Sequence, residues 1–171
     1  MEVFAKPAVG AIIEKEEQGV AYILLQRRQK AGGGETNGLF EVVGGKIREY
    51  ENIFDALRRE VWEETGLTVT EISGEERAER VSVGGATVIS CEPFCVTQNL
   101  SGIYSLIINT FLCRAQGTPV HSTNETQDIH WARLDAVREL VEQHPEKLFP
   151  MDVIALKKYL DYKKRDKETE K

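Results

Sequence analysis

Residues 45–67 of the chain read GKIREYENIFDALRREVWEETGL, and this stretch decides the fold. Phe54, Leu57 and Val61 recur three and four residues apart, which is the spacing of one apolar helix face. A glycine follows at the point where a C-terminal cap is expected. The stretch therefore predicts a helix over residues 52–65.

The predicted helix carries three glutamates on one face. At about 100° per residue, Glu60, Glu63 and Glu64 fall within an arc of about 100°. Like charges so close together destabilise a helix by roughly 0.2–0.5 kcal/mol per pair, so a positive partner is expected. Carboxylate oxygens without histidine or cysteine suit Mg²⁺, with Mn²⁺ as a substitute. The pattern therefore indicates a divalent metal site.

Other residues of this stretch would support such a site. Arg59 stands four residues before Glu63, at the distance where a guanidinium can hold and orient a carboxylate. Gly44 and Gly45 lie between a predicted strand over residues 39–43 and the helix, where the chain must turn tightly. A bare backbone carbonyl could reach a metal there, and a side chain would obstruct the turn.

The whole pattern is G-x5-E-x7-R-E-U-x-E-E-x-G-U, where U is aliphatic, and a chance match in one chain is on the order of 10⁻⁶ or less. This pattern is the Nudix box, so the chain resembles Nudix hydrolases. The resemblance extends over residues 5–145, because the hairpin that ends in basic residues and the strand around Trp131 also look like family features. It implies an α/β fold, an α/β/α sandwich around a mixed β-sheet.

The resemblance also implies roles for particular residues. Glu60 and Glu64 would bind metal, and Glu63 would bind metal or act as general base. The Gly44 carbonyl is a further candidate ligand, and Glu125 would be another metal ligand or the base. The residues that would keep this catalytic arrangement in place are Gly45, Glu51, Arg59 and Gly66.

The sequence says less about substrate recognition than about metal binding. Arg27 and Arg28 end the second predicted strand, where they could bind substrate phosphate through bidentate hydrogen bonds or simply end the strand. Val43 stands where many relatives have proline, which removes no ligand. Val42 stands at a position that is often aromatic in nucleotide-sanitising relatives, which weakens the case for base stacking there.

The predicted reaction is hydrolysis of a phosphoanhydride bond in a nucleoside diphosphate linked to another group, by a metal-activated water. Glu63 or Glu125 would take the proton. The predicted partner is a small nucleotide: a nucleoside triphosphate, a sugar nucleotide such as ADP-ribose, or a dinucleoside polyphosphate.

Two alternative functions stay open. An RNA 5′-triphosphate pyrophosphohydrolase would need a basic track for several phosphates, and a nucleotide sensor of the same fold would lack part of the carboxylate set.

Composition limits the class of protein further. The chain has 171 residues, 41 % of them hydrophobic and 29 % charged, which is ordinary for one globular domain. With 22 Lys plus Arg against 28 Asp plus Glu, the net charge of -6 argues against nucleic-acid binding. We expect a single Nudix domain over residues 1–162 and a charged, frayed tail over residues 163–171.

The start of the chain lacks a basic and then apolar leader, and no segment offers about 18 continuous apolar residues, so a cytoplasmic protein without a membrane partner is predicted. The sequence leaves open whether the protein forms a homodimer. Cys91, Cys95 and Cys113 show no paired spacing and are expected to be reduced thiols. Strands are predicted over residues 8–14, 20–26, 39–43, 68–72, 86–91, 103–113 and 129–132, and further helices over residues 135–144 and 150–162.

Overall fold

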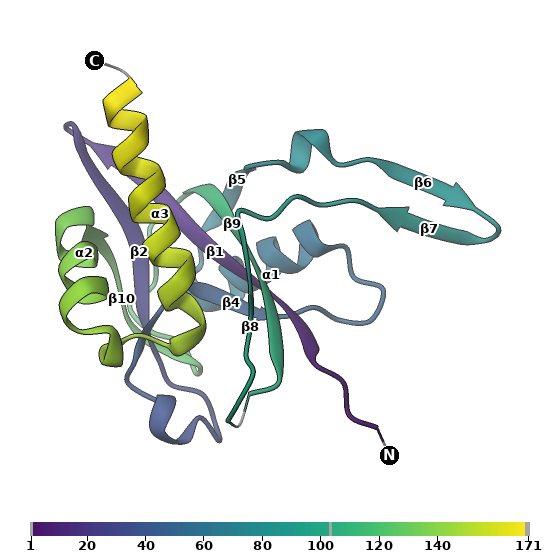
Figure 1. Ribbon diagram of the computed structural model, residues 1–171, viewed down its shortest axis with the longest axis horizontal. Helices are drawn as coiled ribbons and strands as arrows, with labels where there is room; N and C mark the ends of the chain where they lie inside the picture. Colours follow the sequence, from purple (N-terminus) through teal and green to yellow (C-terminus); the bar gives the residue numbers. More distant parts are fainter. Residues whose placement is uncertain (1, 103, 170–171) are drawn as a thin grey trace.

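The computed structural model describes residues 2–102 and 104–169 and places a mixed β-sheet at the centre of the molecule (Figure 1). Its strands are β1 (Lys6–Glu17), β2 (Val20–Arg28), β3 (Phe40–Glu41), β4 (Val43–Lys46), β5 (Thr68–Ile72), β8 (Cys95–Gln98), β9 (Leu106–Gln116) and β10 (Thr126–Arg133). Strand β1 pairs in parallel with β9 and antiparallel with β2 and β4. Strand β10 lies beside β2, and β5 lies beside β9. The prediction of a mixed sheet is therefore confirmed.

Strand β1 is central because both of its faces are apolar. Every residue from 8 to 13 is buried, and a strand covered on both faces shows a continuous apolar run instead of alternation. Val9, Ala11 and Ile13 join the core on one face, and Ile12 joins the core on the other.

Helices cover both faces of the sheet. Helix α1 (Ile53–Thr65) packs on one face, where the rings of Phe54 and Phe111 lie 5.6 Å apart edge to face. Helices α2 (Leu134–Gln143) and α3 (Pro150–Thr169) pack on the other face (Figure 1). This arrangement is the α/β/α sandwich that the sequence predicted.

Helix α1 begins and ends where local sequence predicts. The side chain of Asn52 accepts a hydrogen bond from the Phe54 amide at 2.9 Å, which caps the N-terminus. Gly66 follows the last turn in the left-handed conformation, with φ 72°, and its amide donates to the Trp62 carbonyl. Both ends are thus determined by short-range contacts.

The C-terminal boundary differs from the prediction. Helix α3 continues through Thr169, so the tail expected to fray over residues 163–171 is helical as far as it is described, and residues 170–171 lie outside that part. The ammonium of Lys163 donates to Glu14 on β1 at 3.1 Å. A contact with a strand far away in sequence therefore holds the first turn of this charged segment.

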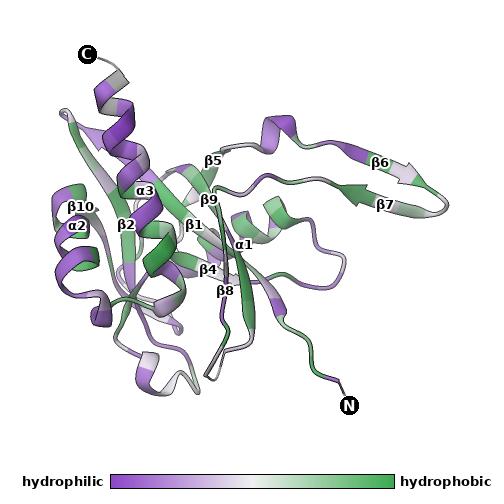
Figure 2. Ribbon diagram, viewed as in Figure 1, coloured by the Kyte–Doolittle hydropathy of each residue, from purple (hydrophilic) through white to green (hydrophobic). Residues whose placement is uncertain are grey.

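Two strands were missed, and both depend on pairing partners. Strand β8 pairs with β9. Within the described part of the chain, strand β6 (Arg80–Val83) pairs with β7 (Ala86–Ile89) alone, and this hairpin extends away from the rest of the molecule (Figure 1). The strand predicted from Ile103 begins at Leu106 in the structure, and Ile103 itself lies outside the described residues. Figure 2 shows hydrophobic residues along the central strands and hydrophilic residues along the last turns of α3.

Short 3₁₀ helices complete the described chain: η1 (Gly34–Thr36), η2 (Glu75–Arg77) and η3 (Pro145–Lys147). Cys91, Cys95 and Cys113 are free thiols, as expected, and the latter two are buried. Over the described residues, no helix combines the length and the apolar character that a membrane span requires.

Candidate active site

A cavity of about 910 Å³ opens beside helix α1, between β4, the loop after β2 and the start of α3. This volume is in the range typical of small-molecule sites. The predicted site residues that line it are Arg28, Gly44, Gly45, Arg59, Glu60, Glu63, Glu64 and Glu125. The structure thus brings together residues from four separate segments of the chain.

The two glycines before the helix lie in close contacts of different kinds: Gly44 lies against backbone, and Gly45 lies against the end of the Glu60 side chain. A Cβ atom on Gly45 would lie 2.2 Å from the carboxyl carbon of Glu60. A Cβ atom on Gly44 would lie 2.4 Å from the Val9 carbonyl oxygen on β1. The expectation that side chains would obstruct this turn is therefore confirmed. Glycine at position 45 gives the Glu60 carboxylate its place against the backbone.

Arg59 connects the carboxylates at this end of the cavity. Its guanidinium donates to both oxygens of Glu51, at 2.7 and 2.8 Å, and also to Glu60 and to Glu63, the latter at 3.2 Å. These bonds from Arg59 are the main reason that the pKa of Glu51 falls to about 2. The predicted contact with Glu63 is present, but the bidentate grip on Glu51 is what orients the guanidinium.

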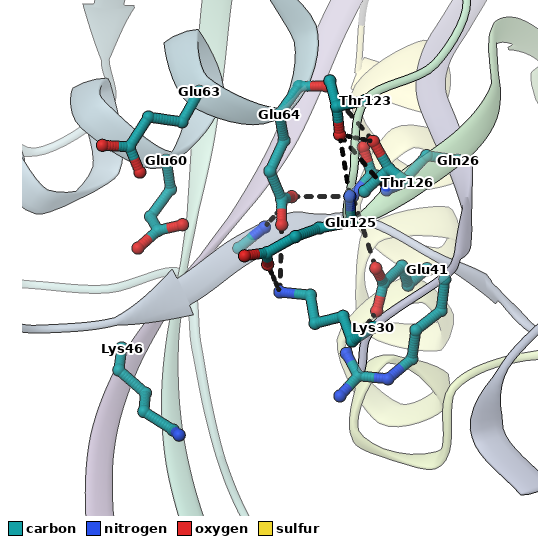
Figure 3. A network of polar contacts seen from close by, with 12 residues as sticks. Gln26, Lys30, Glu41, Lys46, Glu60, Glu63, Glu64, Thr123, Glu125 and Thr126 are labelled. Carbon is teal, nitrogen blue, oxygen red and sulfur yellow. Dashed lines mark hydrogen bonds and ion pairs between the residues drawn. The ribbon is translucent and has the colours of Figure 1, made fainter. Parts of the chain in front are cut away.

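Glu64 is the most buried carboxylate of the box, and it contacts groups that the sequence analysis did not identify. Its Oε2 accepts from the side chain of Gln26 at 2.7 Å and from the Gly44 amide at 3.3 Å. Its Oε1 lies 3.0 Å from the ammonium of Lys30, which also lies 3.2 Å from Glu125 (Figure 3). Burial raises the pKa of Glu64, and the charge of Lys30 opposes that rise.

Arg27 and Arg28, at the end of β2, lie on opposite faces of the sheet because side chains alternate along a strand. Arg28 lines the cavity, where it forms a buried ion pair with Glu41 at 3.0 Å and lies over the ring of Phe149. Arg27 does not line the cavity and instead pairs with Asp128 at 3.1 Å. Only Arg28 is therefore placed where it can contact a ligand in this cavity.

Asp152, in the first turn of α3, also lines the cavity and was missed. It accepts a hydrogen bond from the Val42 amide at 3.0 Å. Burial, together with the negative charge of Glu41, raises the pKa of Asp152 to about 8. Sequence offered one weak signal for it, a carboxylate in the first turn of an otherwise apolar helix face.

The carboxylates fit a divalent ion by their chemistry. Glu60, Glu63 and Glu64 offer only hard oxygen donors, and Glu64 Oε1 is buried without a well-aligned hydrogen bond. Burial raises the pKa of Glu60, and the charge of Glu64 raises it further, so positive charge nearby would stabilise both ionised forms. Among the described side chains, however, no three His, Cys, Asp or Glu groups already gather as a ligand set. Cationic side chains hold them instead, Lys30 at Glu64 and Arg59 at Glu60.

Comparisons with known proteins give a family and a fold. The family model described as NUDIX domain matches residues 5–151. A sequence search of curated proteins found no match. Among solved structures, the chain is similar to the MutT NUDIX hydrolase from Burkholderia pseudomallei, with 21 % identity, 77 % of this chain and 84 % of that chain covered, and a TM-score of 0.55.

Two further structures are similar across nearly the whole chain. One is the NUDIX domain of Shewanella oneidensis NrtR complexed with ADP ribose, with 14 % identity, 95 % and 90 % of the two chains covered, and a TM-score of 0.64. The other is a C. elegans Ap4A hydrolase, with 15 % identity, 92 % and 96 % covered, and a TM-score of 0.55. At such identities the likeness shows a shared fold.

The sandwich fold and the carboxylate-lined cavity together define a hydrolase of pyrophosphate bonds. Since the family match covers most of its length, the chain belongs to the NUDIX domain family, which acts on nucleoside diphosphate-linked substrates.

Proposed function

We propose that the protein is a Mg²⁺-dependent pyrophosphohydrolase that cleaves a phosphoanhydride bond in a nucleoside triphosphate or a related nucleotide. The observation that carries this proposal is the wall of the cavity formed by Glu60, Glu63 and Glu64, all from one helix face. The net charge of the chain is negative, yet cations also surround the cavity, which favours a ligand with several phosphates. These cationic residues are Lys6, Arg28, Lys30, Lys46, Arg48 and Arg59.

The residues of the site would have three roles in the reaction: binding the metal, orienting the metal ligands and accepting a proton. Glu60 and Glu64, together with Glu63 where Glu125 is the base, would hold the divalent ion, which when bound lowers the pKa of a water and neutralises charge on the leaving phosphate. Arg59 keeps Glu60 and Glu63 oriented through the bonds described above. Glu63 or Glu125 takes the proton, since both side chains are half exposed, at 48 % and 51 %, and water reaches both.

Apolar and aromatic groups in the cavity lining suit the nucleoside. Tyr104 and Phe149 lie edge to face there, with ring centroids 5.7 Å apart, and Leu106 and Ile108 extend the apolar surface. A nucleobase has a π-face that packs on such groups. Arg28 lies over both rings, 5.2 Å from the centroid of Tyr104 and 4.7 Å from that of Phe149, so its charge lies beside the aromatic groups. The cavity lining thus offers aromatic groups for the base and charged groups for the metal and phosphates of a nucleotide.

The test is a substrate panel with the full chain and Mg²⁺, in which released phosphate and pyrophosphate are measured. The panel includes nucleoside triphosphates, ADP-ribose, a dinucleoside tetraphosphate and a short RNA with a 5′-triphosphate. Glu63→Gln is the inactive variant, and Glu139→Gln, an exposed glutamate on α2, is the matched control. We expect turnover of a small nucleotide by wild type and by the control. Turnover of the RNA alone, or nucleotide binding without product, would refute the proposal and support the RNA pyrophosphohydrolase or the sensor.

A further inference from the structure

The ammonium of Lys30 lies between two carboxylates that come from distant parts of the chain. It lies 3.0 Å from Glu64 on α1 and 3.2 Å from Glu125, which precedes β10 (Figure 3). The side chain is 21 % exposed and lines the cavity. A lysine in this place is a cation supplied by the protein itself.

The contacts of Glu64 show that this cation occupies one defined position. Its Oε2 is engaged by Gln26 and by the Gly44 amide. Its Oε1 is buried and, among the residues that the structure describes, has the ion pair with Lys30 and no aligned hydrogen bond. A buried carboxylate needs a positive partner to stay ionised. The place beside Oε1 is therefore a cation position, and two cations would repel each other there.

The backbone of Lys30 is fixed by hydrogen bonds, whereas its side chain is long and has several rotatable bonds. Its amide donates to Asn37 at 2.9 Å, and its carbonyl accepts from the Gly33 amide at 2.9 Å. The preceding amide, that of Gln29, donates to the Glu125 carbonyl at 2.8 Å. Rotation within the four-carbon stem can thus move the ammonium away from the carboxylates while the loop keeps its place.

We propose that Lys30 is a displaceable counter-ion: it holds Glu64 and Glu125 together in the metal-free protein and gives up its position when a divalent ion binds. The inference rests on the proposed function, because it takes Mg²⁺ or Mn²⁺ as the cofactor. It makes Lys30 a positioning residue that competes with the metal. The concentration of metal that the enzyme requires is then set in part by this ion pair.

The first experiment measures the accessibility of Lys30 in the full wild-type chain. Lysines are acetylated with a limiting amine reagent, with and without Mn²⁺, and the modification of each lysine is measured by mass spectrometry. Lys46 is the internal control, because it lines the same cavity and, over the described residues, forms no ion pair with a carboxylate. Metal should raise the reactivity of Lys30 severalfold relative to Lys46.

The second experiment measures Mn²⁺ affinity by electron paramagnetic resonance. Lys30→Met should bind Mn²⁺ severalfold more tightly than wild type, and Lys30→Arg should remain close to wild type. Lys46→Met measures the general effect of removing a positive charge from the cavity, so the gain in Lys30→Met must exceed the gain in this variant. If Lys30→Met does not fold, the labelling of wild type still decides the question.

The outcomes separate this inference from the proposed function. If wild type binds no Mn²⁺, the proposed function is wrong, and the inference fails with it. If wild type binds Mn²⁺ but Lys30 reactivity does not change relative to Lys46, only the inference is overturned. Equal Mn²⁺ affinities of the Lys30→Met and Lys46→Met variants would overturn it in the same way. Metal-dependent exposure of Lys30 with tighter binding in Lys30→Met would establish it.

Discussion

The surroundings of Asp152 predict how the free energy of unfolding changes with pH, in both direction and magnitude. The carboxyl group is fully buried beside the cavity, and its pKa is raised to about 8 from an ordinary value of 3.8. In the unfolded chain the group loses its proton near pH 3.8, whereas in the folded protein it keeps the proton until about pH 8. Between these values folding takes up a proton, so the free energy of unfolding falls as pH rises.

The magnitude follows from the width of this interval. Each pH unit above 3.8 lowers the free energy of unfolding by about 1.4 kcal/mol, so at pH 7 the destabilisation reaches about 4 kcal/mol. Asp152→Asn removes the ionisable group, and its amide oxygen can still accept from the Val42 amide. The variant should match wild type near pH 4 and become more stable than wild type as pH rises to 8.

The assay is urea unfolding at a series of pH values from 4 to 8. Asp161→Asn, at an exposed position of the same helix, controls for the simple loss of a carboxylate. The difference in unfolding free energy between Asp152→Asn and wild type should grow steadily over this range. A difference that stays constant with pH, or a variant less stable than wild type at pH 8, would refute the reasoning.

Three other predictions concern the wall of the cavity formed by Glu60, Glu63 and Glu64. Glu63→Gln should lower turnover by about 10²–10⁴-fold, whereas Glu139→Gln should not, because only Glu63 lies in the cavity, and steady-state assays check this. Gly45→Ala should lower kcat and leave the melting temperature close to that of wild type, since the new Cβ would lie 2.2 Å from the carboxyl carbon of Glu60 and the end of that flexible side chain must move away; unchanged kcat would contradict this. Mg²⁺ should raise the melting temperature of wild type and chelator should reverse it, whereas a Glu60→Gln, Glu64→Gln double variant should show no such shift. The shift should fade in acid as the ligands are protonated, and it should begin to fade at a higher pH than ordinary glutamates would give, because burial raises the pKa of Glu60 and Glu64; an equal shift in both proteins would place the ions elsewhere.

Local sequence determined helix α1 and the face on which its carboxylates lie. The apolar spacing of Phe54, Leu57 and Val61, the cap at Asn52 and the left-handed glycine after the last turn act within a few residues of one another. Because a helix fixes the direction of every side chain on it, the glutamate face followed from the sequence alone. The Nudix pattern likewise lies in 23 contiguous residues, so it could be recognised without tertiary structure.

Only the tertiary structure decided which other groups meet those carboxylates. Lys30 and Asp152 reach the cavity from segments that no local rule connects to helix α1. The choice between Arg27 and Arg28 depended on which side of β2 faces the cavity, and this is set by its pairing with β3 and β10. Strands β6 and β8 and the extension of α3 were missed for the same physical reason: strand pairing and helix docking gain their free energy from partners distant in sequence.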